Sequence, residues 1–536
     1  MYLAYLKEGK KFVSGKDNED ISFTIKENGS HKEVSIIAKS NITLLKAKDE
    51  IPFKLNKEDV YFLNGYQSWT DTKEFHLKER LRNIKKSPHL IVKKFGMDKY
   101  GDSTFYKYSI NRLHGYDVFY SKGKYESFIY NLNYKNAYLL IELIKNKKDK
   151  IYLTSMLEGI TLKKDEEIKI IDYHFFSSFK EGLNSFYKDF PLLEKKEKIF
   201  GYTSWYNYYQ NINEEIILRD LDALDSRFNV FQIDDGYETF VGDWLDVDKK
   251  KFPNGLAPIV KKIHEKGYKA GIWLAPFALE RNSKTLKEHP EWVKKDKKGK
   301  PVFAGGNWSG FYALDFYNKD AMEYVRKVLI HYMNMGFDFF KLDFLYAIAL
   351  PDYEGKSRAM IQNEAYAFLR DILKDKLVLG CGANIISSLN NFDYLRVGPD
   401  VSLSFNDSWV MQLFHRERPS TKVTLQNTIF RSIFNEHLFY NDPDVFLLRD
   451  ENISLSLEQR IALTKLNALF GSVLMTSDDI ATYDETKKKI LDEALDIFKN
   501  GKVLSYSTCG KIINIKYSLH EKEYDINYDT IRGVIN

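Results

Sequence analysis

Two aspartates stand where apolar, strand-like stretches of this chain end. Asp343 closes the run 339–343, Phe-Phe-Lys-Leu-Asp, and Asp400 follows shortly after the run 394–397. Retaining hydrolysis of a glycosidic bond uses two carboxyl groups, one as the nucleophile and one as the proton donor. The sequence therefore predicts a glycoside hydrolase in which Asp343 is the nucleophile and Asp400 is the acid/base.

Lys341 lies two residues before Asp343, so in a strand the two side chains face the same way. An ammonium group near a carboxylate favours the ionised form of the acid, which a nucleophile needs. A purely structural ion pair is the alternative, because such pairs also occur without catalysis.

Asp400 follows Gly398 and Pro399, which do not continue a central strand, so we expect it on a loop. Arg396 stands four residues earlier. A guanidinium against Asp400 would lower the pKa of the carboxyl group, the wrong direction for a proton donor. This conflict disappears if Arg396 points at a substrate hydroxyl instead. A plain Gly-Pro-Asp turn is the alternative for Asp400.

Two adjacent acids, Asp234 and Asp235, end the run 230–234 and begin a turn. They could accept hydrogen bonds from neighbouring sugar hydroxyls, hold a divalent cation, or cap a helix or turn. If Asp234 and Asp343 held Mg²⁺ with further strand-end acids, the chain would belong to a different class, an enolising enzyme with Lys341 as its base.

Three tryptophans and one cysteine complete the candidate site. Trp205 and Trp273 lie at or near the ends of two further runs, where a ring offers a stacking wall, although most tryptophans fill cores. Trp69 follows a turn-like Asn-Gly, so we expect it to be exposed and to reach over the pocket. Cys381 stands between two glycines, which indicates close approach of the backbone rather than a reactive thiol.

The pattern of apolar and polar residues along the chain predicts the strands and helices that position these residues. Up to about residue 190, short alternating runs such as 33–38 and 105–110 indicate a β-sandwich. After residue 200, buried runs alternate with amphipathic stretches such as 320–335, which is typical of βα units around a parallel sheet. Eight buried runs, the number that closes a TIM-type (β/α)8 barrel, lie at 201–205, 230–234, 270–274, 339–343, 377–381, 394–397, 438–441 and 473–477. Polar residues gather at their carboxyl ends, so we expect them to share one mouth.

We therefore predict a multi-domain α/β protein of three parts. These are an N-terminal β-sandwich over residues 1–190, a catalytic (β/α)8 barrel over 191–480 and a small C-terminal β-rich domain over 481–536.

Composition limits the partners. The chain has 80 Lys and Arg residues against 75 Asp and Glu, spread along its length, so we expect a small neutral ligand and no nucleic acid. It contains two cysteines and no apolar stretch of the length of a membrane span or a signal peptide. We therefore expect a cytoplasmic protein that binds no membrane.

Several motifs together resemble the bacterial α-galactosidases of glycoside hydrolase family 36. The resemblance covers most of residues 60–480 and rests on the stretches 232–237, 271–277, 340–343, 380–382 and 396–400. It implies a retaining exo-α-galactosidase that releases terminal α-linked galactose from galactosides or galacto-oligosaccharides, with no metal or cofactor.

The same resemblance implies a role for each candidate residue. Asp343 is the nucleophile and Asp400 the acid/base, and Asp234 and Asp235 bind the axial and primary hydroxyls that distinguish galactose from glucose. The remaining residues that it places around the sugar are Trp273 and Lys341 in the pocket wall, Arg396 near the second hydroxyl, Cys381 by the ring and Trp69 above it.

The chain departs from the family pattern at Tyr66, where relatives often carry tryptophan, and at 380–384, where Gly-Cys-Gly-Ala-Asn replaces a Cys-Ser-Gly-Gly motif. It therefore resembles the shorter subgroup, which includes monomers, and its oligomeric state stays open. Two further alternatives also stay open: an α-N-acetylgalactosaminidase, and a sugar-binding protein that has lost catalysis.

Overall fold

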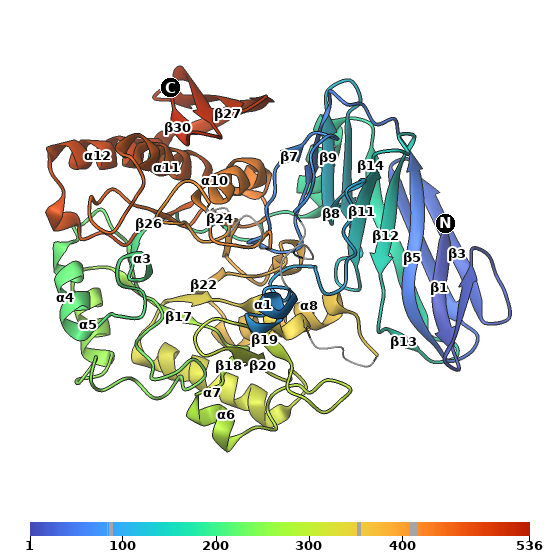
Figure 1. Cartoon of the computed structure of the whole chain (residues 1–536), viewed down its shortest axis with the longest axis horizontal. Coiled ribbons are helices and arrows are strands. Elements are labelled where there is room, and N and C mark those ends of the chain that lie inside the picture. Colours follow the sequence, from blue (N-terminus) through green and yellow to red (C-terminus); the bar gives the residue numbers. More distant parts are fainter. Residues whose placement is uncertain (83, 85–88, 351–354, 408–414) are drawn as a thin grey trace.

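The computed structural model describes residues 1–536 except 83, 85–88, 351–354 and 408–414. Figure 1 shows three groups of elements: blue to teal sheets at one side, a central sheet surrounded by helices, and a small red sheet above the last helices. Within the described part of the chain, no helix combines the length and the apolar character needed to cross a bilayer.

The first group consists of two antiparallel seven-stranded sheets that share one apolar core. One has the order β2 (Lys10–Ser14), β1 (Tyr2–Lys7), β5 (Ile42–Pro52), β12 (Lys150–Met156), β11 (Tyr138–Ile144) and β8 (Arg112–Tyr116), with β13 (Thr161–Leu162) beside β5. The other has the order β3 (Ile21–Asn28), β4 (His31–Ala38), β14 (Glu167–Phe176), β10 (Ser127–Asn131), β9 (Val118–Lys122), β6 (Val60–Leu63) and β7 (Glu74–Phe75).

One expected strand in this region is wrong, because residues 105–110 form no ladder. Their alternating tyrosines are instead held by buried carboxylates: Tyr106 donates its hydroxyl to Glu142 at 2.9 Å, and Tyr108 donates to Asp102 at 2.5 Å. Alternation alone did not distinguish a strand from an irregular segment fixed by side-chain hydrogen bonds.

The central sheet has nine parallel strands, and each of the eight predicted runs overlaps one of them. Its order is β24 (Tyr440–Asp442), β23 (Tyr394–Arg396), β22 (Leu377–Gly380), β21 (Phe339–Leu342), β17 (Lys269–Leu274), β16 (Val230–Ile233), β15 (Ile199–Thr203), β26 (Val473–Thr476) and β25 (Val445–Phe446). The two edge strands, β24 and β25, are separated in the chain only by Pro443 and Asp444. The two edges of the sheet therefore come together.

Helices alternate with these strands and cover the sheet (Figure 1). The longer ones are α4 (Glu214–Ala223), α5 (Ala257–Glu265), α7 (Lys319–Met335), α8 (Arg358–Leu373), α10 (Thr421–Phe430), α11 (Leu457–Phe470) and α12 (Glu485–Asn500). Short helices are α1 (His89–Lys94), α3 (Trp205–Tyr208) and α6 (Lys284–Glu288), and α2 (Phe179–Asp189) follows the first two sheets. A small sheet of β18 (Ala278–Glu280), β20 (Phe311–Ala313) and β19 (Phe303–Gly305) follows β17.

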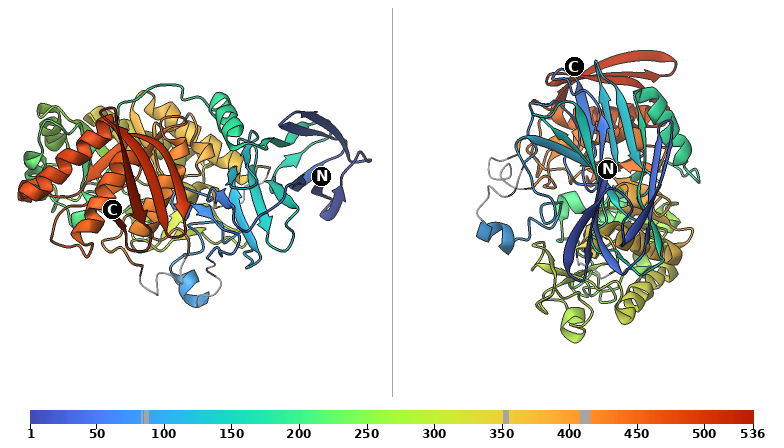
Figure 2. Two further views of the ribbon diagram at one scale, coloured as in Figure 1. Left: turned by 90° about the horizontal axis from the view of Figure 1, so that it is seen from above. Right: turned by 90° about the vertical axis from the view of Figure 1, so that its right-hand side faces the viewer.

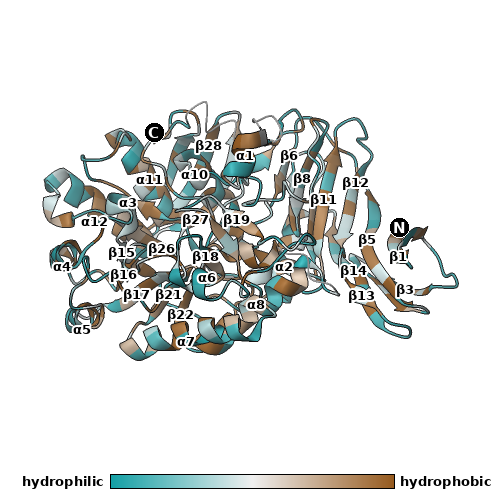
Figure 3. Cartoon of the chain, turned by 60° about the horizontal axis from the view of Figure 1, so that its bottom comes forward, coloured by the Kyte–Doolittle hydropathy of each residue, from teal (hydrophilic) through white to brown (hydrophobic). Residues whose placement is uncertain are grey.

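Helix α7 shows why these segments are helical. Asn318 caps its start by accepting hydrogen bonds from the first-turn amides, and Gly336, in the left-handed conformation, ends it. Its buried side chains recur at helical spacing and include Met322, Val325 and Leu329. Figure 3 shows the same amphipathic pattern on the outer helices, and brown, apolar central strands.

The last sheet is antiparallel and consists of β27 (Lys502–Cys509), β28 (Ile512–Leu519), β29 (Lys522–Asp529) and β30 (Val534–Ile535). It lies over α11 and α12 (Figure 2). Tyr506 packs on Phe430 and Phe470, and Thr508 donates a hydrogen bond to Glu74 of β7. The end of the chain thus contacts both other groups of elements.

Candidate active site

A pocket of about 330 Å³ opens where the central strands end, a size in the range of small-molecule sites. Its wall is formed by Trp69, Phe95, Met97, Tyr100, Trp205, Asp234, Asp235, Trp273, Gly306, Asn307, Trp308, Lys341, Asp343, Phe344, Asp400, His415, Glu417, Arg418 and Pro419. Eight of the ten residues singled out from the sequence are in this wall. The other two, Cys381 and Arg396, are buried and lie outside it.

Asp343 follows β21 directly and is held by two neutral N–H donors. Trp273 Nε1 donates to one carboxylate oxygen at 3.0 Å, and the amide of Phe344 donates to the other at 2.8 Å. Phe344 adopts a left-handed backbone (φ 54°), which turns the chain away as soon as the carboxylate is placed. With 7% of its surface exposed, Asp343 is fixed at the pocket floor with both oxygens oriented.

Lys341 contacts a different acid from the one expected. Its ammonium donates to Asp234 Oδ2 at 2.9 Å, and both side chains are buried. Burial is the largest single influence and would lower the pKa of Lys341, but the Asp234 carboxylate, together with Asp343 and Cys381, raises that pKa above its usual value. The neighbouring carboxylate Asp343 has a smaller influence. Lys341 therefore supports Asp234 first, and Asp343 from a greater distance.

Asp235 is positioned by side chains that the sequence did not single out. Gln210 Nε2 and Trp308 Nε1 donate to its carboxylate at 3.0 and 2.8 Å. Burial raises the pKa of Asp235 and raises that of its neighbour Glu238 far more, partly because Asp235 is nearby. The pKa values of both acids are thus raised, and Asp235 is the one that faces the pocket.

Asp400 lies on the loop after β23, as expected, and Arg396 contacts it. Arg396 Nη1 donates to Asp400 at 2.9 Å, so the predicted conflict between the guanidinium and a proton donor is not removed by Arg396 pointing elsewhere. The pKa of Asp400 is nevertheless raised: burial is the largest cause, and together with the Asp343 carboxylate it outweighs the opposing effects of Arg396 and Lys341. The Asp400 side chain is 38% exposed and borders the pocket.

Trp69 reaches the pocket from the N-terminal part of the chain, but it is 7% exposed and not the exposed ring that the turn predicted. Its indole N–H donates to Cys381 Sγ at 3.3 Å, and its ring lies edge-on to Phe344. The amide of Ser68 donates to Ala383 at 2.8 Å. A Cβ at Gly382 would come within 3.1 Å of the indole, which explains the glycine beside Cys381.

Trp205 begins α3 and also lines the pocket, and its ring meets Tyr209 edge-on. Further wall residues that sequence reasoning missed come from three segments, around residues 100, 308 and 415. Tyr100 stacks on His415, with ring centres 4.9 Å apart, and Trp308 lies in a glycine-rich turn. That turn is a signal of the kind that drew attention to Trp69. Nothing in the sequence pairs residue 100 with residue 415.

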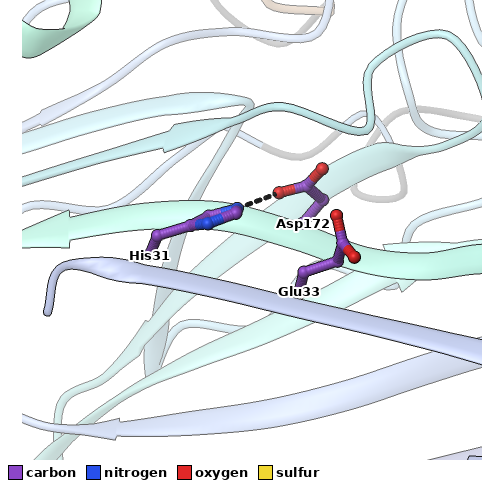
Figure 4. A group of neighbouring side chains, drawn as sticks. All are labelled: His31, Glu33 and Asp172. Atoms are coloured by element: carbon purple, nitrogen blue, oxygen red, sulfur yellow. Dashed lines mark hydrogen bonds and ion pairs between the residues drawn. The ribbon is translucent and has the colours of Figure 1, made fainter. Parts of the chain in front are cut away.

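The described residues contain one cluster of three side chains with metal-ligand spacing, His31, Glu33 and Asp172, away from the pocket on β4 and β14 (Figure 4). Lys169 Nζ already lies 2.8 Å from Glu33 and 2.5 Å from Asp172. Its hydrogen bond lowers the pKa of Glu33 to about 2. The ammonium takes the place a cation would need, so the cluster is a surface ion-pair network.

Known proteins resemble this chain in sequence. A family model described as Melibiase matches residues 190–375. An α-galactosidase of Escherichia coli is 25% identical over 192 residues, which cover 34% of this chain and 26% of that protein. A galactosaminidase of Flavonifractor plautii, named as acting on A type blood α-D-galactosamine, is 30% identical over 147 residues, covering 25% of this chain and 13% of that protein. The aligned stretches thus span about a quarter or less of these relatives.

Solved structures match nearly the whole chain. TtGalA, an α-galactosidase from Thermus thermophilus in complex with p-nitrophenyl α-D-galactopyranoside, gives a TM-score of 0.73 at 25% identity and covers 96% of this chain and 97% of its own. The family 36 α-galactosidase AgaA of Geobacillus stearothermophilus gives 0.64 at 12% identity, over 95% of this chain and 73% of its own. These comparisons confirm the resemblance to glycoside hydrolase family 36 that the sequence predicts.

Proposed function

Given that the chain has the fold of family 36 α-galactosidases and carries a melibiase domain, we propose that it is a retaining exo-α-galactosidase. One observation carries the proposal. Asp343 and Asp400 line the same pocket, and their environments differ in the way that a nucleophile and a proton donor require.

Catalysis proceeds by double displacement. Asp343 attacks the anomeric carbon while Asp400 protonates the departing glycosidic oxygen, and Asp400 then removes a proton from the water that releases galactose. The N–H groups of Trp273 and Phe344 leave one lone-pair direction of each Asp343 oxygen for the sugar. The raised pKa of Asp400 keeps it protonated over a wider pH range than an ordinary aspartic acid.

Asp234 and Asp235 accept hydrogen bonds from the axial and primary hydroxyls of galactose. Both carboxylates border the pocket and each is held by a neighbouring side chain of the wall, Asp234 by Lys341 and Asp235 by Trp308. Trp205 and Trp273 supply apolar walls for the sugar ring. Arg396 and Cys381 act from behind the wall, through Asp400 and Trp69.

The substrate is a small, neutral α-galactoside, and the protein needs no metal or other cofactor. TtGalA, the structural relative described above, was solved with p-nitrophenyl α-D-galactopyranoside and also with stachyose, which supports aryl galactosides and galacto-oligosaccharides as first substrates.

The architecture proposed with this function is a (β/α)8 barrel at residues 191–480, between a β-sandwich at 1–190 and a C-terminal β-domain at 481–536. The meeting of edge strands β24 and β25 supports a closed barrel. The low cysteine count, with Cys381 and Cys509 both free, supports a cytoplasmic location.

The test is a panel of α- and β-linked nitrophenyl glycosides, followed by NMR of the first sugar released. We expect cleavage of the α-galactoside with α-galactose appearing first. First release of β-galactose would overturn the retaining mechanism, and turnover confined to another sugar would overturn the substrate.

A second candidate is α-N-acetylgalactosaminidase, favoured by the galactosaminidase relative. This activity needs room beside the second hydroxyl of the sugar. Nitrophenyl α-N-acetylgalactosaminide, compared with the plain α-galactoside, distinguishes the two: a higher kcat/KM for the N-acetyl substrate would replace the first proposal.

The enolising alternative requires a tight cluster of pocket acids around a metal and no aromatic wall. In the described residues, Asp234 and Asp343 are held by Lys341 and Trp273, and the wall contains three tryptophans besides Trp205: Trp69, Trp273 and Trp308. Loss of activity on treatment with a chelator, restored by Mg²⁺, would favour that alternative. Galactose binding without any hydrolysis would indicate a protein that has lost catalysis.

A further inference from the structure

Behind the pocket wall, one guanidinium is shared by three carboxylates. Arg396 Nη1 donates to Asp400 at 2.9 Å, Nε donates to Asp442 at 2.8 Å, and Nη2 lies 2.8 Å from Asp444. Arg396, Asp442 and Asp444 are each at most 3% exposed, and of the four residues only Asp400 borders the pocket. Asp442 ends β24 and Asp444 lies between β24 and β25, so the joined edges of the sheet supply both additional acids.

This sharing limits what Arg396 offers to Asp400. A guanidinium fork that is free to bind one carboxylate through two nitrogens holds that carboxylate ionised. Here Nε and Nη2 are occupied by Asp442 and Asp444, so Asp400 receives one nitrogen and faces a cation whose charge is already balanced. An acid that must carry a proton to a leaving group needs this weaker contact.

Asp444 also fixes the backbone beside Asp400. Its Oδ2 accepts a hydrogen bond from the amide of Val401 at 2.7 Å and a second one from the hydroxyl of Tyr206. Asp444 itself adopts a left-handed backbone (φ 75°), uncommon for a residue other than glycine. The geometry at Asp444 thus aims its carboxylate at both Arg396 and the loop that carries Asp400.

The groups around Asp400 act on its pKa in opposite directions: Arg396 and Lys341 lower it, whereas burial and Asp343 raise it. The groups that face it are the cations Arg396 and Lys341, the acids Asp343 and Asp444, and the hydroxyl of Tyr206. Burial raises the pKa of Asp444 to about 7, and the Asp400 and Asp442 carboxylates add to this against Arg396. Asp400 and Asp444 therefore titrate as a linked pair.

We propose that Asp444 is a positioning residue for Asp400: by holding Arg396 and the amide of Val401 it keeps Asp400 aimed at the pocket and able to carry the proton for the departing group. The inference rests on the proposed α-galactosidase function. It assigns the segment between the joined edge strands a part in setting the protonation of the acid/base.

The expected sign follows from the charges. A general acid works in its protonated form, so activity falls as pH rises through the pKa of Asp400. In Asp444→Asn one negative charge is lost and Arg396 acts more strongly on Asp400, which lowers the pKa of Asp400. The alkaline limb of the kcat/KM profile therefore moves to lower pH, by about one unit.

The experiment measures pH profiles of kcat/KM for methyl α-galactoside, whose departing group needs protonation, and for p-nitrophenyl α-galactoside, whose departing group needs it less. Asp444→Asn is compared with Asp444→Glu, which restores the charge. Asp442→Asn removes the other acid from Arg396 and gives a second test of the same sign if Asp444→Asn does not fold.

Asp393→Asn is the matched structural control. Asp393 accepts a hydrogen bond from the amide of Val378 at 2.9 Å and forms an ion pair with Arg370 at 2.8 Å. Asp444 makes the same two kinds of contact, but Asp393 precedes β23 and so lies at the opposite end of that strand from Asp400. This variant loses a comparable ion pair far from Asp400, so its alkaline limb stays in place.

We expect the shift in Asp444→Asn and Asp442→Asn, a larger loss on methyl than on p-nitrophenyl α-galactoside, and recovery in Asp444→Glu. If the wild type is active but the alkaline limb of kcat/KM does not move in either Asn variant, and each variant loses activity equally on the two substrates, this inference is overturned. The proposed function then still stands. A wild-type protein that hydrolyses neither substrate overturns both.

Discussion

The end of strand β21 and the loop after β23 each place an aspartate in the same pocket, but the surroundings of the two carboxyl groups differ. Asp343 is 7% exposed, and both its oxygens accept neutral N–H groups. Asp400 touches a guanidinium, yet burial raises its pKa. In the function proposed above, the environment of each aspartate, and not its residue type, assigns the roles of nucleophile and proton donor.

Removal of Asp343 is expected to have the largest effect. Asp343→Ala should lose more than about 10⁴-fold in kcat/KM, because no covalent intermediate can form. Azide, entering the space left by the carboxylate, should restore part of the activity and yield β-galactosyl azide. Near-normal turnover by this variant would contradict the assignment.

Asp400→Ala should lose about 10²- to 10⁴-fold on methyl α-galactoside and less on p-nitrophenyl α-galactoside. Azide should here replace water in the second step and yield the α-azide, the opposite anomer from Asp343→Ala. The wild-type alkaline limb should also disappear, because activity no longer falls with deprotonation of Asp400. The same azide anomer from both variants would remove the distinction between the two acids.

Lys341→Met tests how the pocket floor is supported. It leaves the buried carboxylate of Asp234 without its cation, so the free energy of unfolding should fall by about 3–5 kcal/mol. KM should rise, since Asp234 is no longer held for the sugar. Lys465→Met, which breaks a partly exposed pair with Glu493, is the control and should cost less than about 1 kcal/mol. An equal loss in the free energy of unfolding for Lys341→Met and Lys465→Met would show that the buried ion pair stabilises the protein no more than the partly exposed one.

Trp69→Phe should have the smallest effect. It keeps an aromatic ring in the wall but removes the N–H that donates to Cys381, so KM should rise by at most about fivefold with kcat unchanged. Trp292→Phe, at a buried ring that does not line the pocket, should leave KM as it is. A fall in kcat for Trp69→Phe would mean that the N-terminal segment also orients the catalytic acids.

Periodicity and residue type predicted the strands and the acids at their ends. Each of the eight buried runs overlaps a strand of one sheet, and strand-end residues such as Asp234 and Asp343 meet because parallel strands end at a common face. Such contacts follow from local sequence and topology alone.

Contacts between distant loops could not be predicted in this way. Trp69 is buried because its segment binds the backbone near residue 383, and Arg396 is balanced by Asp442 and Asp444 across an edge of the sheet. Lys341 bonds to Asp234 on another strand in preference to Asp343 on its own. In each case the partner is set by side-chain packing across elements, which the spacing within one element does not encode.

The most direct test of the different roles of the two aspartates is to trap the intermediate with an activated 2,2-difluoro α-galactoside and to map the adduct by mass spectrometry of the digested protein. We predict one 2-deoxy-2,2-difluorogalactosyl adduct, on the peptide that contains Asp343, with loss of the activated leaving group, and none in Asp343→Ala. An adduct on Asp400 would contradict the account. So would labelling of another pocket residue in Asp343→Ala.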